Sequence, residues 1–177
     1  AASIHNVTAT SEWEPAVPQE IALDSTASAT NENEGTAVLA FGHTVGSGLN
    51  RILLVGVGQR NDSLERSVTS ITFGGQALTK IAHQDRAGFG LYSRCELWYL
   101  VAPNIGTNTI TITWDGNVAW KSGIAISYFG VNQTDALGAL TQDGGCTDPA
   151  SHTLVPERAS SVIVDVIHTQ DGLLTVG

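Results

Sequence analysis

The chain has 177 residues, and this length is enough for one domain that buries a large core without metal ions or many disulfides. Asp and Glu total 17 against 8 Lys and Arg, and the resulting net charge of −9 disfavours binding to nucleic acid or to anionic membranes. Only 14% of the residues are charged, while Ser, Thr, Asn and Gly fill the polar positions, which is typical of extracellular β proteins.

The sequence also predicts a location. It contains no methionine, so we expect the N-terminus to arise by processing, and Ala1, Ala2 and Ser3 suit the position after a signal-peptidase cut. No run approaches the length of about 18 apolar residues that a membrane-spanning helix needs. We therefore expect an exported protein, extracellular or on the cell surface, that does not insert into a membrane.

Residues 1–20 predict an extended arm. Residues 3–10 have β-forming character, and Pro15 and Pro18 would stiffen the stretch that follows into an extended linker. The remaining residues, 21–177, are expected to form a single β-sandwich domain.

From residue 21 onward, short runs of β-forming residues recur at intervals of about 8 to 15 residues, as in sandwiches and barrels. Ile110, Ile112 and Trp114 alternate with threonines, which predicts a strand with one buried and one exposed face. Two runs, 51–60 and 119–131, are apolar on both faces and contain glycines, so we expect central strands there. The clearest predicted strands are residues 35–45, 51–60, 67–73, 77–83, 95–102, 108–116, 119–131 and 160–168.

The pair Gly74 and Gly75 follows the alternating run 67–73, and an apolar run restarts directly after it. We interpret the pair as the tight turn of a β-hairpin, where glycine supplies positive φ angles. A phosphate-binding loop would need a helix with Lys and Ser or Thr after it, and the sequence has none. The period of two breaks between Leu78 and Ile81, which predicts a β-bulge or a strand end.

Four segments together resemble a jelly-roll-like β-sandwich domain that is common in secreted and surface-anchored bacterial proteins: LNRILLVGVGQRND, VTSITFGGQALTKI, CELWYLVAPNIGTNTITITW and GIAISYFGVNQTDALGA. The resemblance spans residues 35–167 and implies an antiparallel, two-sheet, jelly-roll-like sandwich with an extracellular location. It implies no catalytic residues. Domains of this type continue beyond the run at 160–168 with a closing strand, so we expect this sandwich to lack its final strand or strands.

Motifs of catalysis and of cofactor binding are missing from the sequence. The five histidines are far apart and show no HExxH spacing, neither cysteine belongs to a CxxC pair, and no GxSxG elbow occurs. We therefore predict a non-enzymatic protein without a cofactor. Calcium is the weak exception, because Asp143 and Asp148 lie in a predicted loop, although such carboxylates are usually solvated turn residues.

Two further pairs of residues are candidates for binding or cross-linking. Tyr92 and Trp120 are the aromatic residues expected to be exposed, and such rings can stack on sugars. Cys95 and Cys146 could form a disulfide in an exported protein, or they could be a buried and an exposed thiol.

The arm suggests a mode of assembly. A β-capable segment tethered to a sandwich that is short of a strand is the arrangement needed for strand addition between subunits, and head-to-tail repetition gives a filament. We expect a structural subunit of a filament, sheath or surface assembly; the alternative is a carbohydrate-binding or adhesive module with a polysaccharide partner. The arm residues expected to contact a neighbour are Ile4, Val7, Ala9 and Trp13.

Overall fold

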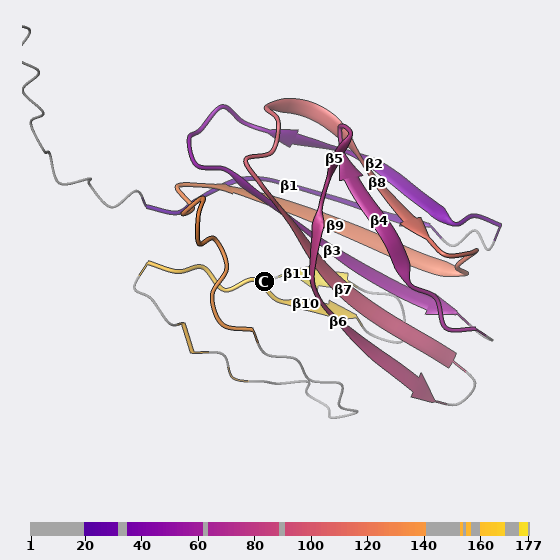
Figure 1. Ribbon diagram of the computed structural model, residues 1–177. Coiled ribbons are helices and arrows are strands. Elements are labelled where there is room, and N and C mark those ends of the chain that lie inside the picture. Colours follow the sequence, from indigo (N-terminus) through magenta and orange to yellow (C-terminus); the bar gives the residue numbers. More distant parts are fainter. Residues whose placement is uncertain are drawn as a thin grey trace, which may run out of the picture.

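The computed structural model describes residues 20–31, 35–61, 64–88, 91–140, 153, 155–156, 160–168 and 174–176. Every regular element in these ranges is a β-strand, and the strands form two antiparallel sheets that pack face to face (Figure 1). The predicted all-β, two-sheet sandwich is confirmed. Within the described ranges no helix is long and apolar enough to cross a membrane. The predicted arm lies outside them, up to residue 19.

The larger sheet has five strands in the order β1 (Ala22–Asn31), β9 (Trp120–Phe129), β3 (Ile52–Asn61), β7 (Leu91–Val101) and β6 (Thr79–Gly88). The smaller sheet has four strands in the order β2 (Val38–Val45), β8 (Gly106–Trp114), β4 (Val68–Phe73) and β5 (Gln76–Ala77). The main hydrophobic core fills the space between these sheets. We call the face of the larger sheet that turns away from this core its outer face.

Strand β8 shows most clearly why the sequence folds this way. Ile110, Ile112 and Trp114 are buried in the core, whereas the intervening threonines are exposed or half-buried. The alternation predicted from the sequence is confirmed, and each buried aliphatic side chain contributes about 1.5 to 3 kcal/mol through its removal from water.

Strands β3 and β9 lie inside the larger sheet, as their apolar character on both faces predicted. Gly123 on β9 allows the other sheet to approach closely, because a Cβ there would lie 2.8 Å from Phe41 Cε1. Gly56 on β3 does the same on the outer face, where a Cβ would lie 2.8 Å from Val166 Cγ2. Both glycines therefore mark places where another part of the chain packs directly against the sheet.

The turn predicted at Gly74 and Gly75 is confirmed. Both residues have positive φ angles, 53° and 87°, and they join β4 to β5. A bulge interrupts the pairing of β6 with β7 between Lys80 and Ala82, which confirms the predicted break in period. Because of this bulge, Ile81 joins the apolar residues of the outer face.

The structure corrects three predictions. β1 was not predicted, because its Ser, Thr and Ala residues lack the large apolar side chains that reveal a strand. β6 ends later and β7 begins earlier than the predicted strands 77–83 and 95–102, because polar residues near the connecting loop also pair across the two strands. The predicted strand at 160–168 is wrong for most of its length, because only the last three residues are a strand.

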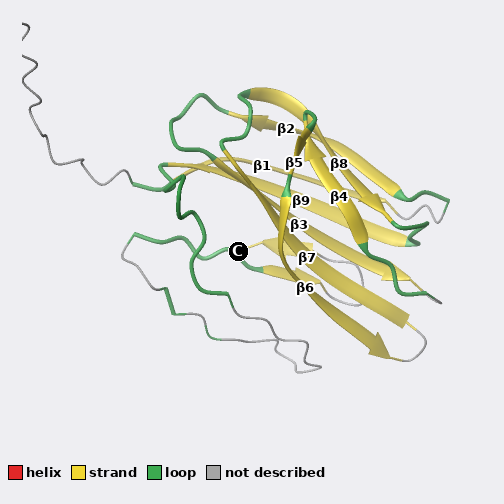
Figure 2. Cartoon of the chain, in the orientation of Figure 1, coloured by secondary structure: helices red, strands yellow, loops and turns green. Residues whose placement is uncertain are grey.

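These last residues join neither large sheet. β10 (Val166–His168) pairs only with β11 (Leu174–Val176) among the described residues, and both strands contact the larger sheet through its central strands. Figure 2 shows residues 131–140 and 160–165 as loop on the same side. The C-terminal part of the chain therefore covers the outer face instead of extending a sheet.

The turn provides a test of the fold. Gly75→Ala should lower the free energy of unfolding by about 1 to 2 kcal/mol, because alanine resists a positive φ angle although the surrounding space is open. Urea denaturation measures the change. Gly42→Ala is the matched control: Gly42 lies mid-strand in open space without a positive φ, so this change should stabilise by about 0.5 kcal/mol. Equal effects of the two changes would contradict the explanation.

Candidate functional site

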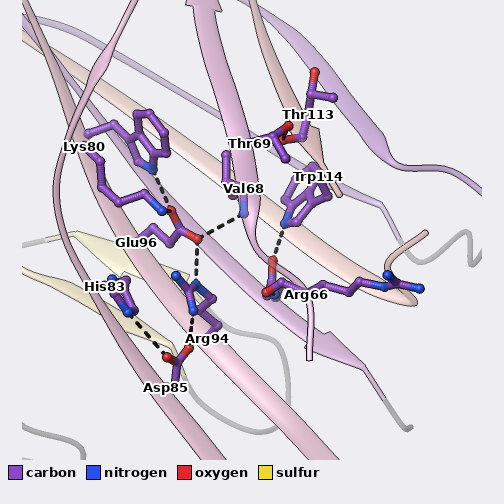
Figure 3. Close-up of polar contacts among 12 residues, drawn as sticks. Arg66, Val68, Thr69, Lys80, His83, Asp85, Arg94, Glu96, Thr113 and Trp114 are labelled. Atoms are coloured by element: carbon purple, nitrogen blue, oxygen red, sulfur yellow. Dashed lines mark hydrogen bonds and ion pairs between the residues drawn. The ribbon is translucent and has the colours of Figure 1, made fainter. Parts of the chain in front are cut away.

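A buried carboxylate, Glu96 on β7, joins the two sheets (Figure 3). Its Oε1 accepts hydrogen bonds from the backbone N–H of Val68 at 3.1 Å and from Arg94 Nε at 2.7 Å. Its Oε2 accepts one from Trp98 Nε1 at 2.9 Å and lies 2.7 Å from Lys80 Nζ. The four donors come from β4, β6 and β7, so one side chain links the facing sheets.

The charges in this network are held in their ionised forms. Burial alone would raise the pKa of Glu96, but the hydrogen bonds from Lys80, from Val68 and from Arg94 outweigh it and lower the pKa. Burial would likewise lower the pKa of Arg94, but the hydrogen bonds and charges of Glu96 and Asp85 raise it. A carboxylate occupied by four donors acts as a structural link and has no lone pair placed for acid–base chemistry.

A second polar cluster lies where β1 and β2 meet. Asp24 Oδ2 accepts hydrogen bonds from the backbone N–H of Gly46 at 2.9 Å and from Ser127 Oγ at 2.8 Å. His43 Nε2 lies 3.1 Å from the same Oγ, and His43 Nδ1 has no hydrogen-bond partner among the described residues. Because Ser127 donates its proton to Asp24, His43 Nε2 is the donor to Ser127.

This cluster contains Ser, His and Asp but not the geometry of a catalytic triad. In a triad the carboxylate accepts from the histidine, whereas here Asp24 accepts from Ser127. His43 and Ser127 are also almost fully buried, at 2% and 0% exposure, so no substrate reaches them. The cluster instead joins the edges of the two sheets.

The outer face of the larger sheet carries a second apolar cluster and an apolar groove of about 280 Å³. The floor of the groove comes from β3, β6, β7 and β9, and its walls come from residues 136–140 and 161–166. We call this feature the outer groove. Residues that define it are Ile52, Leu54, Leu97 and Tyr128 in the floor and Leu137 and Val164 in the walls.

One wall of the outer groove is unusual because it is strand-forming sequence that is not in a strand. Residues 162–164, VIV, belong to none of the strands that the structure describes. Val162 and Ile163 keep 44% and 45% of their surface exposed, and Val155 on the same side keeps 73%. The structure thus leaves several β-branched side chains in water beside the groove.

Tyr92 and Trp120, the residues predicted to contact glycans, lie at the same end of the larger sheet and are both half-buried. They pair with Asn61 and Arg60, which are neighbours on β3. Adjacent strand residues point to opposite faces, so the two rings do not form one platform. The Arg60 guanidinium lies 3.8 Å from the centre of the Trp120 ring in a cation–π contact.

Cys95 is half-buried on the outer face and lines the outer groove, where burial raises the pKa of its thiol. Its predicted partner lies outside the described residues, so the disulfide stays a prediction. The described residues contain no group of three His, Cys, Asp or Glu side chains that could hold a metal ion. The predicted residues outside the described ranges are Ile4, Val7, Ala9, Trp13, Asp143, Cys146 and Asp148.

Sequence reasoning missed the outer groove. The available signal was the apolar character of both faces of the runs 51–60 and 119–131, which requires a covered outer face as well as a covered inner one. Sequence alone could not show that segments far along the chain, at 136–140 and 161–166, would supply the cover.

No protein-family model, curated protein or solved structure matches the chain.

Removing the central carboxylate should weaken the fold strongly. Glu96→Ala removes the shared acceptor of the buried Arg94, the half-buried Lys80, an indole N–H and a backbone N–H, so the free energy of unfolding should fall by about 3 to 5 kcal/mol in urea denaturation. Glu65→Ala is the control, since Glu65 meets Arg94 at 3.8 Å from an exposed position and should cost less than about 1 kcal/mol. A loss for Glu96→Ala no larger than that of its control would contradict the assigned role.

The buried histidine should make stability depend on pH. Burial lowers the pKa of His43, although the charge of Asp24 opposes this, so the unfolded chain binds the proton more readily. The stabilisation is complete above the unfolded pKa of about 6.5 and is lost as the pH falls through the folded-state pKa. Histidine changes its charge between about pH 8 and pH 5. As the pH is lowered over this range, the urea midpoint should fall more steeply for the wild type than for His43→Gln. Parallel curves would rule out this origin.

Proposed function

We propose that the protein is a non-enzymatic structural subunit of an extracellular filament, sheath or surface assembly, joined to its neighbours by pairing of extended segments. The observation that carries this proposal is the wall at residues 162–164, which has strand-forming sequence but belongs to no strand in the described part of the chain. An exposed segment of this kind is a ready partner for a strand from another molecule.

The exposed side chains of this wall support the same proposal. Val162 and Ile163 are β-branched residues that favour a paired, half-buried strand, yet they are nearly half exposed. Covering them with a neighbouring strand would remove apolar surface from water, at about 25 cal/mol per Å². A second molecule therefore gains free energy by docking at this place.

The β6 edge of the larger sheet is less suited to strand addition. β6 is an edge strand of the larger sheet, and it carries Lys80, His83, Asp85 and Arg86. Charged residues on an edge strand disfavour pairing with another chain. The uncharged run at 162–164 is therefore a better acceptor than β6.

Assembly tests this proposal directly. The purified chain should form polymers whose amount rises with concentration, visible by electron microscopy and sedimentation velocity. Deleting residues 1–18 should abolish them, because the deletion removes the predicted donor segment while leaving every described residue in place. Globular monomers of the intact chain at high concentration would overturn the proposal.

A carbohydrate-binding or adhesive module is the second candidate function. The observation that favours it is a small cleft of about 60 Å³, lined by Tyr92 together with the polar residues Gln59, Glu65, Arg66, Asp85, Arg86, Ser93 and Arg94. Ring stacking and hydrogen-bonding groups together suit a sugar. A module of this kind would stay monomeric and be retained on a polysaccharide column, and Tyr92→Ala would release it.

A further inference from the structure

We infer that the outer groove is a binding site for an uncharged, elongated apolar small molecule, which its apolar lining holds and to which the Tyr128 hydroxyl donates a hydrogen bond. This inference goes beyond the proposed function, because it assigns a ligand to the groove and does not require assembly. Three observations carry it: the fixed floor of the groove, the charges of the residues that line it, and the free hydroxyl of Tyr128.

The floor of the groove is held in place by the sheet itself. β3 lies in its middle and pairs from Ile52 to Arg60 with β9 on one side, while β7 pairs with it on the other. The backbone of β3 is therefore satisfied within the sheet, and Ile52 and Leu54 are fixed at the bottom of the groove. A groove with such a floor is pre-formed, as small-molecule sites usually are.

The dimensions of the groove suit an elongated molecule. The strands that line it, β9, β3, β7 and β6, are consecutive in the larger sheet, and three strand spacings of about 4.8 Å span about 14 Å. Its volume of about 280 Å³ lies near the lower limit of small-molecule sites. Water finds few hydrogen-bond partners between aliphatic walls, so an apolar molecule that replaces it is stabilised.

The charges around the groove exclude an anionic ligand. The described residues that line it include Asp165, Glu96 and His83 but no Lys or Arg, so a carboxylate or phosphate would lose its hydration without meeting a fixed countercharge. The two acidic residues do not call for a cationic ligand either. Glu96 is bonded within the inner network, and Asp165 already has an interaction partner. The matching ligand is therefore uncharged.

Two polar groups that line the groove stay neutral. Burial raises the pKa of the Tyr128 phenol and of the Cys95 thiol, so both keep their protons at neutral pH. The Tyr128 hydroxyl makes no hydrogen bond with another described residue. A ligand with a carbonyl, ether or hydroxyl oxygen supplies the acceptor that this hydroxyl lacks.

Nile red is a suitable probe, because it is uncharged, elongated and apolar and carries a carbonyl oxygen. Titration of the full chain, at concentrations where it is monomeric, should give a saturable rise in fluorescence with about one dye bound per chain. Decanol should displace the dye at a concentration at least about tenfold lower than decanoate, because only decanoate brings a negative charge into the groove.

Variants of the lining test the site. Ala136→Trp fills one wall and should weaken Nile red binding at least about tenfold. The matched control is Ala40→Trp, which adds the same side chain at an exposed position on β2 in the smaller sheet and should change binding less than about twofold. Tyr128→Phe removes only the hydroxyl, so it should weaken binding about fivefold and leave the urea midpoint unchanged.

Cys95 reports where the dye binds, since it lines the groove. In a full-length chain that carries Cys146→Ser, saturating Nile red should slow the reaction of Cys95 with iodoacetamide several-fold, because this reaction requires access to the thiol.

The outcomes separate this inference from the proposed function. Absence of saturable Nile red binding would overturn the inference. Binding that Ala136→Trp and Ala40→Trp weaken equally, or that leaves Cys95 equally reactive, would place the dye on other apolar surface and overturn it too. Unchanged affinity of Tyr128→Phe would overturn the assigned hydrogen bond. The proposed function fails through a different result, the absence of polymers from the intact chain, which leaves the dye titration unaffected.

Discussion

The sandwich depends on one buried carboxylate. Glu96 receives the backbone N–H of Val68 from the smaller sheet, together with Lys80 and Arg94 from the larger one. The N–H of Val68 would otherwise need a neighbouring strand or water, so a side chain takes over the role of a missing strand. Because each donor of this network is satisfied, the charges can be buried without destabilising the fold, and they fix how the two sheets lie relative to each other.

The same principle operates where β1 meets β2. Asp24 accepts from the backbone N–H of Gly46, and Ser25 donates to the backbone carbonyl of Thr44. In both places, side chains of the larger sheet therefore bond to backbone groups of the smaller sheet or of the residue that follows β2. The outer groove is apolar and lies on a face of the larger sheet, away from these contacts. The position of this apolar surface explains why we place the proposed contact on the outer face.

The sequence revealed the features that depend on near neighbours along the chain. Alternation in β8, the turn at Gly74 and Gly75 and the break before Ala82 could be predicted because strand period and turn chemistry are local. β1 could not, since Ser, Thr and Ala carry little signal without their partner strand. The Glu96 network and the outer groove could not either, because each unites residues that are distant in sequence. Predicting them requires the pairing of whole strands, which composition does not encode.

The pairing of β10 with β11 alone has a consequence for how the molecule unfolds. This hairpin rests on the larger sheet through side-chain packing, such as that of Val166 over Gly56, and shares no backbone ladder with it. Its amide protons can therefore exchange with solvent by a local opening that leaves the sandwich intact. The C-terminal part would then behave as a separate cooperative unit of low stability, and proteases would cut there before they reach the sheets.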